Sequence, residues 1–461
     1  MGLRNCTPAL GAGLIAVLAI GCGGSDPSAS ADGAAPATIP QPTQAELKAA
    51  GLANLPLAPE SERLDIEAPT FSNPTEVTNP LFPVSDLDSV VFSGTVEGKP
   101  FHTETTLLPE TKLIEWAPGQ QVEALVSQYS AFIDGRLEEV ATDYYAQADD
   151  GSVWYLGEDV FDYDENGFGD SNLGSWLAGR EGPPEMIMPA DPQVGDVHRA
   201  ENIPAIAFEE VAIKTIDKTV SGPPGRVEGA MVARELHDDG TYSQKVFAPG
   251  YGEFFTAHGR EVEALALAVP TDALGGGTPP ELEDLSADAD DLFDASRSGD
   301  WQAAANGEKA ASRAWDAFQQ RQVPPRLATD MDRALRTLAA GIDARDRAKA
   351  GTGSIDVAQS ALDLQLRYAP PTEIDLGRFE QWTRQILVDA AAGDVGGVRS
   401  AVSTMEWVRD RFAHAIESAD LTAIDQSLVA MREGLLDGEL KVTAEEAANL
   451  RRTLAGVEPV T

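Results

Sequence analysis

The chain has 461 residues, of which 75 are acidic and 34 are basic, so its formal net charge is −41. This length is enough for about two to four domains. A hydrophobic content of 43% can fill cores of that size and excludes a chain that is disordered throughout. Nucleic-acid binding depends on Lys and Arg side chains that displace counterions from phosphates, so the acidic balance excludes DNA and RNA as partners.

The first 22 residues are typical of an export signal. An apolar stretch follows Arg4, and it is shorter than the roughly 20 residues that a membrane-spanning helix needs. The segment Ala19-Ile20-Gly21-Cys22 resembles the lipobox of bacterial lipoproteins, whose leader is cleaved before a diacylated cysteine. The resemblance implies a signal peptide over residues 1–21 and a lipid such as palmitate on Cys22. An ordinary secretory signal that is cleaved nearby is the alternative.

Cysteine usage favours lipidation, because the two cysteines of the chain are Cys6, inside the leader, and Cys22. Without its leader the chain could form no disulfide, Cys-ligated zinc site, iron–sulfur cluster or c-type haem. We expect a protein of the cell envelope that is anchored to a membrane, on the extracytoplasmic side, through its N-terminal lipid. Gly23 stands where an Asp would imply inner-membrane retention, so the outer membrane is expected if two membranes are present.

Residues 22–70 are expected to form a lipid-anchored flexible linker. The stretch after Cys22 is rich in Gly, Ser, Ala and Pro. Such a composition buries too little apolar surface to offset the entropy lost on ordering. A tether of this kind would hold the folded part of the protein clear of the lipid headgroups.

Residues 71–270 show the alternation of apolar and polar side chains that is typical of half-buried strands. The clearest segments are 89–96, 101–108, 122–129 and 211–216. Dipeptides such as Glu97-Gly98 and Asp134-Gly135 separate them and supply the positive φ angles of tight hairpin turns. We predict an antiparallel β-domain, a β-sandwich or a partly open barrel, of about 9 to 12 strands by turn spacing.

Motifs between residues 79 and 257 together resemble an uncharacterised family of bacterial extracytoplasmic β-proteins. They are Asn79-Pro-Leu-Phe-Pro, Trp154-Tyr-Leu-Gly-Glu-Asp, Gly174-Ser-Trp, Ile187-Met-Pro-Ala-Asp-Pro-Gln-Val-Gly-Asp and Ala248-Pro-Gly-Tyr-Gly. The resemblance carries no activity that could be assigned to this chain. The strand after the first motif usually opens with Trp in that family, whereas this chain has Ser89-Val-Val-Phe.

Residues 279–458 change to the 3.6-residue period of bundle helices with one buried face. Thr278-Pro-Pro-Glu281 predicts a capping box at the start of the first helix. Gly299-Asp300 and Gly393-Asp394 each predict a left-handed helix end followed by a carboxylate that caps the next helix. The fold class is therefore multi-domain α+β, with an antiparallel β-domain followed by an all-α helical bundle.

The acidic segment 162–170 matches the opening of a calcium loop. Its candidate ligands are Asp162, Asp164, Asn166, Phe168 and Asp170. Leu173 replaces the bidentate Glu at the twelfth position and no helices flank the loop, so an acidic hairpin turn is the alternative. No other cofactor is predicted.

Catalytic patterns are not found in the sequence. The five histidines are not paired at helical spacing, as a zinc or di-iron site needs. Neither Gly-x-Ser-x-Gly, Ser-x-x-Lys nor His-Glu-x-x-His occurs, so no catalytic residue is assigned. Trp154, Tyr155, Trp176, Tyr144 and Tyr145 form an aromatic group that favours a sandwich core over a sugar or peptide groove.

These features favour a non-enzymatic binding or interaction module, lipid-anchored outside the cytoplasm, with an unknown protein or small ligand as its partner. One alternative is an extracytoplasmic hydrolase or metal-dependent enzyme that uses Asp and Glu side chains. Another is a cation-binding structural protein, which the acidic charge suggests. The sequence leaves the oligomeric state open.

Overall fold

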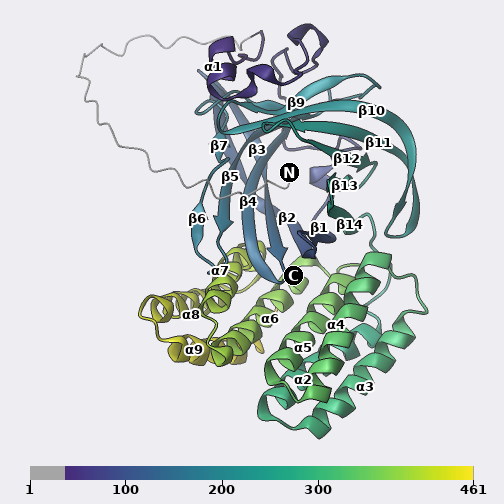
Figure 1. The fold of residues 1–461 in the computed structure, drawn as a ribbon, viewed down its shortest axis with the longest axis vertical. Coiled ribbons are helices and arrows are strands. Elements are labelled where there is room, and N and C mark those ends of the chain that lie inside the picture. Colours follow the sequence, from purple (N-terminus) through teal and green to yellow (C-terminus); the bar gives the residue numbers. More distant parts are fainter. Residues whose placement is uncertain (1–36, 460–461) are drawn as a thin grey trace.

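The computed structural model describes residues 37–459, and in it an antiparallel sheet is followed by a helical region (Figure 1). This order confirms the α+β fold class. The described part of the sheet has 14 strands: β1 (Ser89–Val96), β2 (Lys99–Ala117), β3 (Gln120–Ile133), β4 (Arg136–Gln147), β5 (Val153–Tyr163), β6 (Gly169–Ser171), β7 (Trp176–Leu177), β8 (Glu185–Met188), β9 (Val197–Ile203), β10 (Ala207–Gly222), β11 (Gly225–His237), β12 (Tyr242–Ala248), β13 (Gly252–His258) and β14 (Glu261–Val269). The signal peptide, Cys22 and the linker up to residue 36 lie outside the described residues.

The strands follow one another as an up-and-down meander in two halves. One half runs from β6 to β1, the other runs from β14 to β9, and β1 pairs with β14 where the halves join. β8 pairs with β5 yet lies beside β9, which is at the far end of the strand order. The sheet therefore curls back toward itself into a partly open barrel, as Figure 1 shows.

Tight hairpins set the register of the long strands. Glu97 and Gly98 have φ angles of 51° and 79°, and Asp134 and Gly135 have angles of 52° and 77°. Two successive positive φ angles define the turn that matches the right-handed twist of the flanking strands. The dipeptides predicted as hairpin turns thus join β1 to β2 and β3 to β4.

Eight α-helices and one short 3-10 helix (Ala413–Ala415) follow the sheet in the described residues. The α-helices are α2 (Pro280–Ser298), α3 (Trp301–Phe318), α4 (Pro325–Ala344), α5 (Arg347–Gln365), α6 (Pro371–Ala392), α7 (Val395–Phe412), α8 (Ser418–Leu436) and α9 (Leu440–Leu454). Their apolar faces form the buried cores of the helical region. Within residues 37–459, no helix combines the length and the apolar character that crossing a bilayer requires.

The structure confirms two of the predicted helix ends and contradicts a third. Gly299 and Gly393 adopt left-handed φ angles of 81° and 75°, and the carboxylates of Asp300 and Asp394 accept hydrogen bonds from the first turns of α3 and α7. Both Gly-Asp predictions are confirmed. The capping box at Thr278 is wrong, because Pro279 is the N-cap residue of α2 and no side chain caps this end.

Residues 37–70 fold against the sheet, whereas we expected all of 22–70 to be a flexible linker. This segment contains α1 (Gln44–Ala49), and its Leu47 and Leu52 are buried with Phe208 of β10. The apolar residues of the segment are too sparse to form a core of their own. The surface that buries them belongs to the β-domain, so local composition did not predict this packing.

Candidate functional site

The curled sheet surrounds a cavity of about 120 Å³. Both halves of the sheet contribute to its wall, since Asp143 of β4 lines it together with Glu253 of β13 and Glu263 of β14. A smaller neighbouring cavity of about 40 Å³ shares the side chains of Phe82, Tyr145 and Glu253 with the first. The interior of the barrel is thus the candidate site, and an apolar wall with a few carboxylates is typical of ligand pockets.

Aromatic rings form much of the cavity wall. Tyr145 stacks on Tyr155 with ring centroids 5.0 Å apart and 18° between the ring planes. Tyr155 meets the edge of Trp176 at 5.4 Å, and Phe82 meets Tyr145 at 5.1 Å. The aromatic group predicted as a sandwich core is indeed buried. One member, Tyr145, also lines the cavity.

Asp143 and Glu263 are almost fully buried carboxylates in this cavity, with 2% and 4% exposure. The hydroxyl of Tyr155 donates to Asp143 Oδ1 at 2.6 Å, and Thr103 Oγ1 donates to Glu263 Oε1 at 2.8 Å. Burial raises the pKa of Asp143 to about 7. Burial and the nearby charge of Glu253 raise the pKa of Glu263 to about 7 as well. Both groups therefore titrate near neutral pH.

The pKa of Glu253 is displaced in the other direction because a buried lysine lies beside it. Lys245 Nζ lies 4.0 Å from Glu253 Oε2 and 3.3 Å from Glu235 Oε2. Burial opposes ionisation of Glu253, but the ammonium group of Lys245 holds its pKa below the ordinary range. The cavity therefore contains carboxylates whose pKa values are displaced in opposite directions.

A second cluster of titratable side chains lies on β10 and β11 beside this lysine. Glu209, Glu235 and His237 each present one ligand atom, and these atoms lie within 4.8 Å of one another. His237 Nδ1 is 3.6 Å from Glu209 Oε1, and Lys245 makes an ion pair with Glu235. Two carboxylates and one imidazole are a ligand set that a divalent metal can use. The ammonium group of Lys245 already supplies positive charge there.

Three of the motifs are hydrogen-bonded to one another, and two of them contribute residues to the cavity wall. Asn79 Nδ2 donates to the carbonyl oxygens of Gly151 and Pro189, both at 3.0 Å. Gly250 N donates to Pro80 O at 2.8 Å, which joins the first and the last motifs. These bonds hold the segment before β1 against the β4–β5 and β12–β13 connections. Segments that are far apart in the chain thus build one wall.

The predicted calcium loop is a hairpin turn on the outside of the barrel. Asp164 Oδ1 accepts hydrogen bonds from the backbone amides of Asn166 and Phe168, at 2.9 and 2.8 Å. The guanidinium of Arg399 on α7 lies 3.6 Å from the centroid of the Phe168 ring. Asp162 pairs with Ser171 in the β5–β6 ladder. The loop thus packs against the helical region, and calcium binding there remains a prediction.

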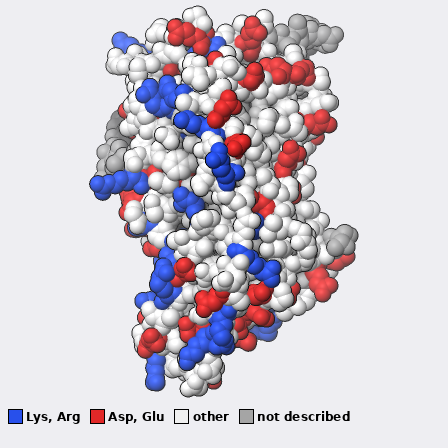
Figure 2. Space-filling view, turned by 90° about the vertical axis from the view of Figure 1, so that its right-hand side faces the viewer, with Lys and Arg blue, Asp and Glu red and all other residues white. Residues whose placement is uncertain are grey.

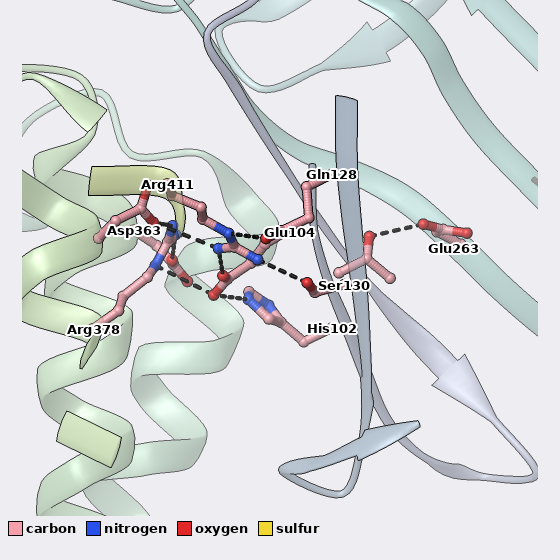
Figure 3. A network of polar contacts seen from close by, with 10 residues as sticks. His102, Glu104, Gln128, Ser130, Glu263, Asp363, Arg378 and Arg411 are labelled. Carbon is pink, nitrogen blue, oxygen red and sulfur yellow. Dashed lines mark hydrogen bonds and ion pairs between the residues drawn. The ribbon is translucent and has the colours of Figure 1, made fainter. Parts of the chain in front are cut away.

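A buried charge network joins the sheet to the helices (Figure 3). Glu104 of β2 makes ion pairs with Arg411 of α7 and with Arg378 of α6, whose Nε lies 3.2 Å from Glu104 Oε1. Arg411 also donates to Gln128 Oε1 at 2.6 Å and to Ser130 Oγ at 2.8 Å. The charges of both arginines are paired with carboxylates of the protein, so this network serves the packing of the two regions.

Sequence reasoning did not find the residues of the barrel interior. Asp143, Glu253 and Glu263 are polar residues within alternating strands, where a polar side chain is ordinarily read as facing solvent. His237 stands two residues after Glu235, a spacing that places both side chains on one face of a strand. That spacing was the one local feature that could have indicated the cluster of Glu209, Glu235 and His237.

Comparison with known proteins places the chain in no family. No family model matches it, and neither a curated protein nor a solved structure does.

Proposed function

We propose that this protein is a lipid-anchored extracytoplasmic binding protein whose curled sheet holds a small ligand in its interior cavity. The observation that carries this proposal is the cavity of about 120 Å³ between the two halves of the sheet. Stable apolar cavities of about 150 Å³ are known to hold a small aromatic molecule. The ligand proposed here is therefore of that size.

The assembly of the cavity supports binding as its role. Cavities cost stability because their walls lose packing contacts, so a fold that served packing alone would gain by filling this space. The motifs that contain Asn79, Tyr155 and Tyr251 converge at the cavity from distant parts of the chain. The helical region packs on the outer face of the sheet and leaves the interior to the ligand.

The face of the molecule that Figure 2 shows carries both signs of charge. Basic side chains form a short diagonal run across its upper half, and acidic side chains lie beside them. This mixture supports a small ligand over a nucleic acid as the partner, in agreement with the net charge.

Native mass spectrometry of the full-length protein, extracted from its own envelope with a mild non-ionic detergent, tests the proposal. We expect an additional mass that a Ser127→Phe variant loses, because Ser127 is a small buried residue in the cavity wall. The matched control is Ser221→Phe, since Ser221 is exposed on β10. A mass retained by both variants, each with an unchanged melting temperature, would place the ligand elsewhere.

One observation favours the enzyme alternative. Glu263 has a pKa raised to about 7 while Glu253 has a lowered pKa, and both line the same cavity. Two carboxylates with separated pKa values can act as a general acid and a general base. Conversion of the copurified ligand during incubation, abolished by Glu263→Gln, would establish this alternative. A ligand mass that stays constant over time would favour simple binding.

A further inference from the structure

We propose that the cavity binds a small organic cation, an ammonium group carried on an aromatic or aliphatic body. This inference rests on the proposed function, because it names the ligand class of the same cavity. The charge of the wall, a free carboxylate oxygen, the aromatic rings and the cavity volume point to this ligand class.

The charge of the wall is one-sided. Asp143, Glu253 and Glu263 line the cavity, and among its described lining residues there is no Lys, Arg or His. Lys245 lies behind Glu253, where it also pairs with Glu235. Asp143 and Glu263 form no ion pair with any described residue. A cation in the cavity would give these two carboxylates an ion-pair partner, which no described residue provides.

Glu263 offers a free hydrogen-bond acceptor to such a ligand. Thr103 donates to its Oε1 atom, whereas no described residue donates to its Oε2 atom. The residue is 4% exposed and lies on the inner side of β2, opposite the ion pairs of Glu104 (Figure 3). Because Glu263 lines the cavity, this free oxygen can be reached from the cavity. An ammonium N–H group is a strong donor for a carboxylate oxygen.

The rings and the size of the cavity define the rest of the ligand. Phe82, Phe92, Tyr129, Tyr145 and Tyr251 line the wall. Aromatic faces attract a cation that lies within about 6 Å of the ring centroid. Leu87, Val90 and Leu107 complete the lining with aliphatic surface, which suits an apolar body. At about 120 Å³ the cavity can accept a single six-membered ring with one short substituent.

A metal ion fits the same wall less well. Calcium takes six to eight oxygen ligands, and the carboxylates of the cavity are interspersed with tyrosine rings and aliphatic side chains. The set with a histidine, Glu209, Glu235 and His237, lies where the ammonium group of Lys245 already pairs with Glu235. An organic cation is therefore the occupant that we infer, and metal binding is an outcome of the test.

Isothermal titration calorimetry of the full-length protein, dialysed free of ligand, tests the inference with three probes of matched shape. We expect benzylamine, which is an ammonium ion at pH 8, to bind at least about tenfold more tightly than benzyl alcohol. Benzoate should bind more weakly than either, because the wall is acidic. The comparison of amine and alcohol needs no variant, so it does not depend on the folding of a mutant.

Variants assign the binding to this wall. Asp143→Asn and Glu263→Gln keep the acceptor oxygens for Tyr155 and Thr103, and each should weaken benzylamine binding about tenfold while leaving benzyl alcohol unchanged. Glu228→Gln is the matched control, because Glu228 is an exposed carboxylate on β11.

Three outcomes would overturn the inference. Equal affinity for the amine and the alcohol would leave a binding cavity but remove its preference for cations. Tight binding of calcium or zinc that is lost in Glu263→Gln, with no heat from benzylamine, would replace the organic cation by a metal ion. No binding of any probe, while native mass spectrometry still detects a copurified ligand, would contradict the ligand class and leave the proposed function standing.

Discussion

Asp143 and Glu263 show how strongly the fold changes the chemistry of individual residues. Each carboxyl group is removed from water and receives hydrogen bonds from neutral hydroxyl groups, without an ion pair to a described residue, so its pKa rises to about 7. Glu104, on the opposite face of the same strand as Thr103, is equally buried. Burial opposes its ionisation as well, but Arg378 and Arg411 hold its pKa well below the ordinary range. The partner, and not burial alone, decides the protonation state.

The raised pKa values predict that stability falls as pH rises. Between about pH 4.5 and 7 the unfolded chain has released the protons of Asp143 and Glu263, while the folded protein keeps them. The unfolded state binds fewer protons, so the free energy of unfolding decreases with pH, by up to about 1.4 kcal/mol per pH unit for each group. Glu263→Gln should remove the contribution of Glu263 to this pH dependence of the free energy of unfolding. Urea unfolding at a series of pH values measures the effect.

Glu228→Gln serves as the control for that experiment, because an exposed carboxylate keeps an ordinary environment when the protein folds. Its stability profile should run parallel to that of the unchanged protein. A parallel profile for Glu263→Gln as well would show that Glu263 is not protonated in the folded state.

At the scale of elements, β2 links the two regions because its faces serve different partners. Thr103 points into the barrel toward Glu263, and the next residue, Glu104, points outward to the arginines of α6 and α7. The backbone amide of Leu137 in β4 adds a hydrogen bond to Ser400 Oγ of α7 at 3.0 Å. The helical region is thus fastened to the wall of the barrel that bears Asp143.

Breaking this attachment should be costly. Arg411→Met leaves Gln128 and Ser130 without their donor and Glu104 with one arginine fewer, so we expect a loss of about 3–5 kcal/mol in the free energy of unfolding. Arg432→Met removes an arginine that pairs with Glu406 but is 61% exposed, and should cost less than about 1 kcal/mol. If chemical denaturation shows the same loss of unfolding free energy for both variants, burial does not make the contribution of the network larger than that of an exposed ion pair.

A glycine allows α4 and α5 to pack with their backbones in contact. A Cβ atom at Gly353 would lie 2.6 Å from the backbone of Leu338. Gly353→Ala should therefore destabilise the protein by about 1–3 kcal/mol, although alanine favours helices. Gly275→Ala is the control, because nothing lies within 4 Å of that position and the change should be nearly neutral. A gain in melting temperature for Gly353→Ala would show that the helices separate easily.

At the scale of the whole molecule, the proposed lipid anchor would place the cavity outside the cytoplasm, where a small ligand could reach it. The proposed anchoring would depend on the thiol of Cys22, and the only other cysteine in the chain is Cys6. The two residues therefore form a matched pair for testing the anchor.

Cys22→Ala should abolish incorporation of labelled palmitate and move the protein from the membrane fraction to the soluble fraction. Cys6→Ala should leave both properties unchanged, because that residue lies in the predicted leader. Lipid labelling that persists in Cys22→Ala would exclude this anchor. Stable membrane association needs more than one acyl chain, so partial release of the unchanged protein into the soluble fraction would indicate that its acylation is incomplete.

Local patterns in the sequence determined a large part of the architecture. Alternating side chains and the turns at Glu97-Gly98 and Asp134-Gly135 indicated an antiparallel sheet, and the 3.6-residue period indicated the helices that follow. The Gly-Asp pairs at 299–300 and 393–394 marked helix boundaries. These predictions succeeded because each depends on backbone preferences within a few residues.

The tertiary structure decided where the site lies. Asp143 and Glu263 are 120 residues apart, and they share a cavity only because the sheet curls until its two halves face each other. Alternation shows that a strand has two faces, but it does not show which face turns inward. The same limit explains residues 37–70, whose few apolar side chains are buried by a surface that the distant strand β10 provides. Local periodicity determined the elements of this protein, whereas long-range curvature determined which of its carboxylates meet.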